Sequence, residues 1–174
     1  DITFQCDDGN GGLATYFYLD GSDSTANPQT VFPDNSFLCF GGNTTTQTGD
    51  LYIKHNGSNS FINNYTGNLT IKNEAADKDI IFSCDDGSGG AETYFFLDGS
   101  ASSGNPFTVF PDSSQLAFGT GNDMLLYHTG SHSYITNATG NLYIGTETSG
   151  VAIVIGHSTS EITIGDNILV QGNL

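Results

Sequence analysis

The chain has 174 residues, and its charge is sparse and one-sided: three Lys, no Arg and 19 acidic residues give a net charge of −16. Nucleic-acid and anionic-lipid phosphates are bound mainly by Lys and Arg, so we expect no nucleic-acid partner. No apolar run approaches the about 20 residues that cross a bilayer, so we expect no membrane insertion. Charged residues form 13% of the chain, against about 25% in typical globular proteins, while 23 residues are Gly. This composition favours β-strands joined by turns.

The sequence is a tandem repeat, which decides how its elements are read in chain order. Residues 1–40 recur as residues 79–118, with 27 identities in 40 positions. Five additional residues near 44–48 then shift the alignment. After them, residues 50–71 recur as residues 123–144, with 12 identities in 22 positions.

Apolar and polar residues alternate within each copy. Ile2, Phe4 and Cys6 are separated by polar neighbours, which predicts a half-buried strand. Asp-Gly, Gly-Gly and Asn-Gly pairs between such runs predict tight turns. No segment combines a helical period with a capping residue, so almost no helix is expected. We interpret Cys6 and its repeat partner Cys84 as small buried apolar residues.

The chain divides by pattern into three segments: a first β-repeat module at 1–78, a second at 79–145 and a tail at 146–174. In the tail, Gly follows short apolar runs at intervals of about nine residues, which is typical of a short-rung β-solenoid. We therefore predict an all-β, extended repeat fibre with strands of the β-solenoid or interleaved β-prism type. The chain begins without Met and stops within the pattern, so we interpret it as a processed or excerpted piece.

A single module is small for a core of its own. At about 75 residues, many of them in turns, it buries little apolar surface. The edges of its Thr-, Ile- and Val-rich strands would also lack partners. Both problems disappear when several chains wrap around a shared axis. We therefore predict a homotrimer, with a monomeric right-handed solenoid as the alternative.

Three motifs resemble a known group of fibre proteins. IxFxxDDGxGGxxTYFxLDGS begins at Ile2 and again at Ile80, GTGNDxxLYHxGSxSYI begins at Gly119, and GVAIVIGHSTSEITIGDNILVQGNL begins at Gly150. Together they resemble modules of bacteriophage tail-fibre and tail-associated structural proteins, especially marine and cyanobacterial ones, over essentially the whole chain. The first copy departs from the pattern at its five-residue insertion and at Lys54. The resemblance implies a trimeric, β-rich shaft or receptor-proximal segment of a virion tail.

The repeated Asp-Asp-Gly segments raise the question of calcium. Asp7 and Asp8, with their counterparts Asp85 and Asp86, place carboxylates on a sharply turning loop, and Ca²⁺ takes oxygen ligands. The spacing matches neither the EF-hand loop nor the calcium-binding nonapeptide repeat. Asp before Gly also forms turns without any ion. The sequence leaves both interpretations open, and it requires no cofactor.

The histidines offer a second, weaker metal hypothesis. A trimer would bring His132 or His157 to its axis three times, and imidazoles gathered in this way bind transition metals. A hydrogen-bonded or surface imidazole is the alternative. No Cys–His cluster has zinc spacing.

Consecutive aromatic residues at 16–18 and 94–96 are the best candidates for recognition. Successive strand residues face opposite sides, so one set faces away from Phe17 and Phe95. We expect this set to close a subunit interface, or to stack on the sugar rings of a host-surface glycan. Its members are Tyr16, Tyr18, Tyr94 and Phe96.

We expect no enzymatic activity. A glycosidase needs two carboxylates placed across a sugar, but each attractive acid pair is duplicated together with its turn, as scaffold residues are. The sequence favours a structural fibre protein, in a virion tail or extracellular, that extends toward the host surface and helps attach to it. The alternatives are a subunit of a microbial extracellular filament or adhesin, and a polysaccharide depolymerase.

Overall fold

The computed structural model describes residues 1–22, 27–42, 49–100, 104–145, 153–156, 159 and 162–165. Twelve strands and no helix lie in this part of the chain, so the predicted all-β fold is confirmed. The same residues therefore include no helix long and apolar enough to span a bilayer. The chain divides into two compact units, Asp1–Lys72 and Asn73–Leu174.

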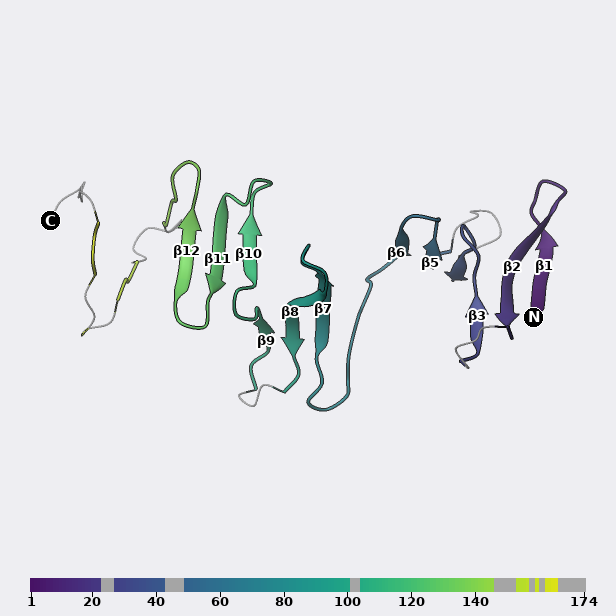
Figure 1. Cartoon of the computed structure of the whole chain (residues 1–174), viewed down its shortest axis with the longest axis horizontal. Coiled ribbons are helices and arrows are strands. Elements are labelled where there is room, and N and C mark those ends of the chain that lie inside the picture. Colours follow the sequence, from purple (N-terminus) through teal and green to yellow (C-terminus); the bar gives the residue numbers. More distant parts are fainter. Residues whose placement is uncertain are drawn as a thin grey trace. The chain divides into compact units, whose positions relative to one another are not determined.

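The first unit contains two three-stranded antiparallel sheets (Figure 1). The first sheet has the order β1-β2-β3 and consists of β1 (Ile2–Asp7), β2 (Leu13–Asp20) and β3 (Gln29–Val31). The second sheet has the order β4-β5-β6 and consists of β4 (Leu38–Phe40), β5 (Leu51–His55) and β6 (Ser60–Asn64). Neighbouring strands are consecutive in the sequence, so each sheet is a meander with two edge strands.

The second unit repeats this organisation. Its first sheet has the order β7-β8-β9 and consists of β7 (Ile80–Asp85), β8 (Ala91–Asp98) and β9 (Phe107–Val109). Its second sheet has the order β10-β11-β12 and consists of β10 (Gln115–Phe118), β11 (Met124–His128) and β12 (Ser133–Asn137). The sequence repeat is thus a repeat of paired three-stranded meanders.

The longest hairpin of each unit contains a β-bulge. Phe17 and Thr15 lie opposite consecutive residues of β1, so Tyr16 is an additional residue in β2. The β7–β8 hairpin has the same register shift, which makes Tyr94 the additional residue of β8. A bulge increases the local twist and redirects a side chain. The repeat therefore builds the same twisted hairpin twice.

A Pro-Asp turn joins the two sheets within each unit. In the first unit Asn35 has φ 64°, and its backbone amide donates to the carbonyl of His55 at 2.8 Å. The next residue, Ser36, donates from Oγ to the carbonyl of the bulged Tyr16 at 2.5 Å. The second unit has the same turn, with Ser113 at φ 67°. The turn thus connects the bulge of one sheet to the end of the central strand of the other.

The strand register gives each sheet two distinct faces, because residues paired across antiparallel strands project to the same side. On one face of the β1-β2-β3 sheet, Phe4 stacks on Phe17 with ring centroids 4.4 Å apart, and Phe17 stacks on Phe32 at 5.7 Å. We call this side of the β1-β2-β3 sheet its open face. In the β4-β5-β6 sheet, the open face is the side that does not carry Tyr52. The other side of each sheet is called the opposite face. In the first unit the open faces comprise residues 2, 4, 6, 14, 17, 19 and 30 of one sheet and residues 38, 40, 51, 53, 55, 60, 62 and 64 of the other.

The open faces of the second unit occupy the equivalent strand positions. Phe82 stacks on Phe95 at 4.5 Å, and Phe95 stacks on Phe110 at 5.7 Å. The open faces comprise residues 80, 82, 84, 92, 95, 97 and 108 of one sheet and residues 116, 118, 124, 126, 128, 133, 135 and 137 of the other.

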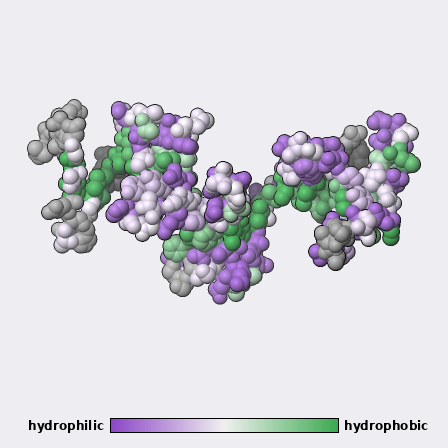
Figure 2. Space-filling model, in the orientation of Figure 1, coloured by the Kyte–Doolittle hydropathy of each residue, from purple (hydrophilic) through white to green (hydrophobic). Residues whose placement is uncertain are grey.

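Little apolar surface is buried within the described residues. Tyr52 is the one hydrophobic residue among them that is buried, with 6% of its surface exposed, and no side chain is fully buried. It lies on the opposite face of its sheet, against Phe37 at 5.0 Å and Tyr65 at 5.8 Å between ring centroids. Figure 2 shows hydrophobic surface exposed on both units. The sheets therefore do not pack into a conventional core.

One expectation is wrong for the single chain, because Cys6 and Cys84 are exposed. Both lie on the open faces of their sheets. Most of the tail at 146–174 lies outside the described residues, so its solenoid-like structure stays a prediction. The described strands form separate antiparallel sheets, and the finer predictions of a β-solenoid, a β-prism and a homotrimer remain predictions as well.

Candidate functional site

The acidic loop between β1 and β2 uses its carboxylates to hold its own backbone. The amide of Gly9 donates to Asp7 Oδ1 at 2.6 Å. The amides of Asn10 and Gly12 donate to Asp8 Oδ1 at 2.7 and 3.0 Å. These bonds, the one from Asn10 first, lower the pKa of Asp8. The two carboxylates therefore act as turn-forming residues, as their position before Gly predicts.

The loop between β7 and β8 has the same construction. The amide of Gly87 donates to Asp85 Oδ1 at 2.7 Å. Asp86 Oδ1 accepts from both the hydroxyl and the amide of Ser88, at 2.6 and 2.8 Å, and these bonds lower the pKa of Asp86. Across the described residues, no three His, Cys, Asp or Glu side chains gather in a way that would hold a metal ion. The Ca²⁺ site remains a prediction without a formed ligand cluster.

The bulged tyrosines hold these acidic loops in place. The hydroxyl of Tyr16 donates to the carbonyl of Asp7 at 3.0 Å, and that of Tyr94 donates to the carbonyl of Asp85 at 3.1 Å. Nevertheless, 48% of Tyr16 and 44% of Tyr94 is exposed. Each ring thus combines a fixed orientation with an accessible surface, as an aromatic contact with a sugar or a second chain requires.

The other two aromatic candidates lie on opposite faces. Tyr18 is paired with Val31 of β3, and Phe96 is paired with Val109 of β9. Both side chains are half-buried. The structure therefore separates the four predicted residues into two exposed tyrosines at bulges and two half-buried rings on strand faces.

The histidines of the described residues are held locally. His132 lies in the turn between β11 and β12, where its ring meets Tyr134 edge-on at 6.4 Å. His55 and His128 have Nδ1 at 3.0 Å from the hydroxyls of Ser60 and Ser133, respectively. The other predicted axial ligand, His157, lies outside the described residues.

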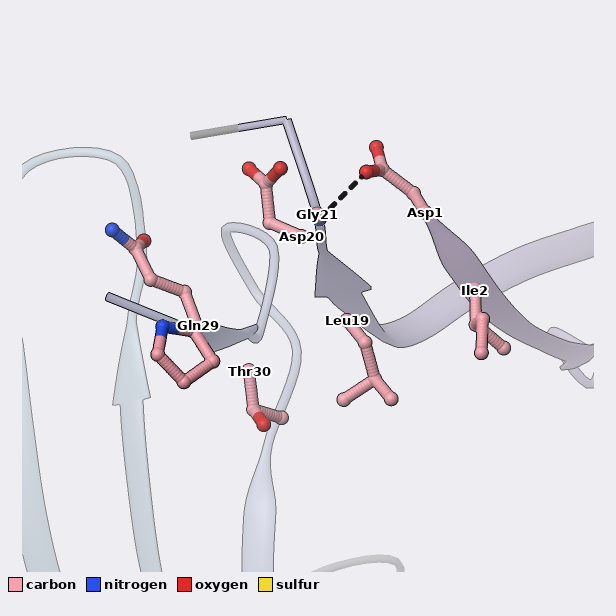
Figure 3. A pocket seen from close by; sticks show the side chains of 8 residues that line it. Asp1, Ile2, Leu19, Asp20, Gly21, Gln29 and Thr30 are labelled. Atoms are coloured by element: carbon pink, nitrogen blue, oxygen red, sulfur yellow. Dashed lines mark hydrogen bonds between the residues drawn. The ribbon is translucent and has the colours of Figure 1, made fainter. Parts of the chain in front are cut away.

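A shallow hollow of about 450 Å³ lies at the end of the β1-β2-β3 sheet (Figure 3). Asp1 Oδ1 accepts the amide of Gly21 at 2.9 Å and closes one side. The side chains of Ile2, Leu19 and Thr30 point together to one side of the sheet. The hollow is therefore a continuation of the apolar open face, with acidic and polar residues such as Asp1 and Gln29 at its rim.

A larger groove of about 740 Å³ lies in the second unit, between the beginning of β8 and the turn before β10. Glu92, Tyr94, Gln115 and Asn122 are among its lining residues. The first copy has Ala14, Phe37 and Gly49 where the second has Glu92, Gln115 and Asn122, respectively. The groove therefore carries polar groups that the first copy lacks.

The first unit has an aromatic cluster that the sequence analysis missed. Asn63 Nδ2 donates to the hydroxyl of Tyr52 at 2.8 Å, and this hydroxyl lies 3.3 Å from that of Tyr65. The hydrogen bond with Tyr65, aided by burial, raises the pKa of Tyr52. Lys54 Nζ lies 4.4 Å from the centre of the Phe37 ring, a cation–π contact. The signal was available, because these positions are among those that differ between the copies.

The pKa values of the Asp8 and Asp86 carboxyl groups are both lowered by hydrogen bonds within their loops. What the described residues do present in quantity is apolar surface on the open faces. Comparison with protein-family models, with curated proteins and with solved structures found no match to this chain.

Proposed function

We propose that this chain is a non-enzymatic structural segment of an extended homotrimeric fibre, of the phage tail-fibre type that its motifs resemble. In this proposal the repeated units set the length and stiffness of the fibre, and the fibre carries an attachment surface toward the host. The carrying observation is the amount of surface that a single chain leaves in contact with water.

The exposed area of the chain is far above that of a self-contained protein. The mass is 18.3 kDa, and a folded monomer of that mass exposes about 8,100 Å². This chain exposes 14451 Å², which is about 6,300 Å² more than the expected value. A stable interface removes about 800 Å² from each partner. The surplus equals several such interfaces, as expected for a chain enclosed by neighbours in a fibre.

The strand edges support the same proposal. Each sheet ends in two strands that have one neighbour within the sheet. All six residues of β1 are exposed, and neither β1 nor β7 contains the Lys or Pro that commonly protects an edge. Long unprotected edges pair with other chains. Pairing with neighbouring copies satisfies these edges and prevents uncontrolled aggregation.

The attachment role rests on the groove of the second unit. Its amides and carboxylates supply donors and acceptors for sugar hydroxyls, and Tyr94 supplies an exposed ring. Host-surface glycans are the partner that this chemistry fits. A panel of immobilised neutral glycans should retain the native chain and retain a Tyr94→Ala variant less well. Equal retention of both would remove the groove from the proposal.

Two alternative functions make different predictions. A microbial filament that grows by strand complementation would form polymers of indefinite length instead of a fixed number of chains. A depolymerase would release reducing ends from host capsule and lose this activity when one acid pair is replaced.

Sedimentation equilibrium of the purified chain at low micromolar concentration, with and without chelator, tests the proposal. We expect a mass of three chains in both conditions if Ca²⁺ has no structural role, and dissociation by chelator if it has one. A monomer in both conditions would overturn the fibre proposal. A continuous series of larger masses would favour the filament.

A further inference from the structure

The two copies within the chain provide an internal comparison of the open and opposite faces. Of the 15 open-face strand positions of the first unit, 12 are identical in the second. The exceptions are Ala14/Glu92, Leu51/Met124 and Ile53/Leu126. Two of these three replace one apolar residue by another. The open faces are therefore nearly the same surface presented twice.

The opposite faces have diverged much more. They comprise residues 3, 5, 7, 13, 15, 18, 20, 29, 31, 39, 52, 54, 61 and 63 of the first unit. Only four of these 14 positions are identical in the second unit, namely 7, 15, 20 and 31. Yet Tyr52, the one buried hydrophobic residue among the described residues, belongs to this divergent set. Internal packing of the chain thus tolerates change that the open faces have not undergone.

The retained faces carry large apolar side chains that are exposed to water. Ile62 and Ile135 are 60% and 61% exposed, and Phe4 and Phe82 are 45% and 42% exposed. Apolar side chains that stay this exposed in the described part of the chain have little intramolecular reason to stay identical. Monomeric proteins rarely leave continuous apolar patches of this kind in water. A partner that contacts both units in the same way accounts for the pattern.

We infer that the open faces of all four sheets pack against the open faces of further copies of this same chain, with the opposite faces turned away from that contact. This inference rests on the proposed self-assembling fibre and names the surface that assembles it. A further copy is the partner that the observations favour, because it presents the same apolar face twice and at the same spacing along the chain. The surplus exposed area is large enough for several such contacts.

The native cysteines report on this arrangement without any substitution. Cys6 and Cys84 lie on open faces, Cys39 lies on an opposite face, and all three are exposed in the single chain. In the native assembly, a maleimide reagent should modify Cys6 and Cys84 about tenfold or more slowly than Cys39, because a covered thiol is not accessible. Peptide mass spectrometry after short labelling measures the three rates separately.

Charged substitutions test the same surface. Ile62→Asp with Ile135→Asp places one carboxylate on an open face of each unit, at side chains that are more than half exposed and therefore contribute little to folding of the single chain. The matched control is Leu13→Asp with Ile81→Asp, which adds the same charge on opposite faces at 77% and 59% exposed positions. We expect the first double variant to fall to the mass of one chain while the control keeps the native mass.

The outcomes separate this inference from the proposed function. An assembled native chain whose three cysteines react alike, and whose assembly survives the open-face carboxylates, would overturn the inference and leave the fibre in place. Loss of assembly in both double variants would also overturn it, because the faces would then not differ. A native chain that is monomeric would overturn the fibre proposal and the inference together.

Discussion

The first sheets of the two units are nearly superimposable in their interactions, whereas the second sheets are built differently. The Phe4–Phe17 and Phe82–Phe95 stacks differ by 0.1 Å, at 4.4 and 4.5 Å. In the second sheets, the Tyr52 cluster of the first unit is replaced by a Tyr127–Tyr134 stack at 4.9 Å. Where one side of a sheet is covered by its own chain, the two copies pack that side with different side chains. Where large apolar side chains stay exposed in the described residues, as on the open faces, they are retained.

The largest expected difference in stability between the two units comes from the aromatic cluster. Tyr52→Ala removes the ring that Phe37 and Tyr65 pack against and should cost the first unit about 3 kcal/mol. Its counterpart Leu125 is half-buried, so Leu125→Ala should cost the second unit only about 1–2 kcal/mol. Hydrogen exchange of the strand amides of each unit measures both costs. Equal costs would show that the cluster does not stabilise its unit beyond ordinary packing.

The glycines after β2 and β8 should also distinguish the units. A Cβ at Gly99 would collide with the backbone carbonyl of Lys78, whereas a Cβ at Gly21 has only Asp1 Oδ1 nearby, at 4.0 Å. Gly99→Ala should therefore destabilise the second unit by about 1–3 kcal/mol, the usual cost of overpacking. Gly21→Ala should leave the first unit within about 0.5 kcal/mol of the native value. Thermal unfolding of the two single variants makes the comparison directly, and the reverse ranking would contradict it.

The serine that donates a hydrogen bond to the bulged tyrosine should contribute equally to the stability of both units. Ser36 and Ser114 each donate to the carbonyl of a bulged tyrosine at 2.5 Å. Removing either hydroxyl by substitution to Ala should cost about 1 kcal/mol, the net value of one such hydrogen bond. Chemical denaturation of Ser36→Ala and Ser114→Ala tests whether the shared part of the repeat is energetically the same. A difference larger than the cost itself would show that the two turns are not equivalent.

Much of the fold follows from the sequence, because alternation and turn residues act over short distances. The pattern around Ile2 and Phe4 predicts a strand, and Asp-Asp-Gly predicts the turn after it. Alternation does not identify the open face, however, because both sides of β2 carry aromatic residues. The bulge at Tyr16 also interrupts the alternation from which the facing of Tyr16 was predicted, whereas Tyr18 does face away from Phe17. Such a bulge depends on pairing across the hairpin and on Ser36, which is 20 residues away.

The candidate site was predictable in part, for a similar reason. The role of the repeated Asp residues as turn formers was one of two interpretations, and the hydrogen bonds to Asp8 and Asp86 fit it. The Tyr52 cluster involves Phe37 and Tyr65, which are brought together only by the sheet. Its signal in the sequence is joint replacement, because Phe37, Tyr52 and Tyr65 all differ from their repeat partners.

The smallest expected effect is a dependence on pH in the acidic loops. The hydrogen bonds to Asp8 and Asp86 lower both pKa values below the ordinary 3.8. A carboxylate whose folded-state pKa is depressed stabilises the folded loop fully above the unfolded pKa, and this contribution is lost as the pH falls through the folded pKa. The loops should therefore loosen only below about pH 4. The carboxylates are exposed, so the change should be confined to the loops and leave the strands intact.

The amides of Asn10 and Ser88 can report on the two loops in a nuclear magnetic resonance titration. A titration from about pH 6 to about pH 2 spans the ordinary carboxyl pKa. Asp8→Asn and Asp86→Asn keep an acceptor oxygen and remove the ionisation, so the transition should vanish from the substituted loop and persist in the other.

The two loops differ in one respect, because the side-chain hydroxyl of Ser88 makes the largest contribution to the lowered pKa of Asp86. Ser88→Ala should therefore raise the midpoint in the second unit toward the ordinary value. An unchanged midpoint would assign the shift to the backbone amides that both copies share.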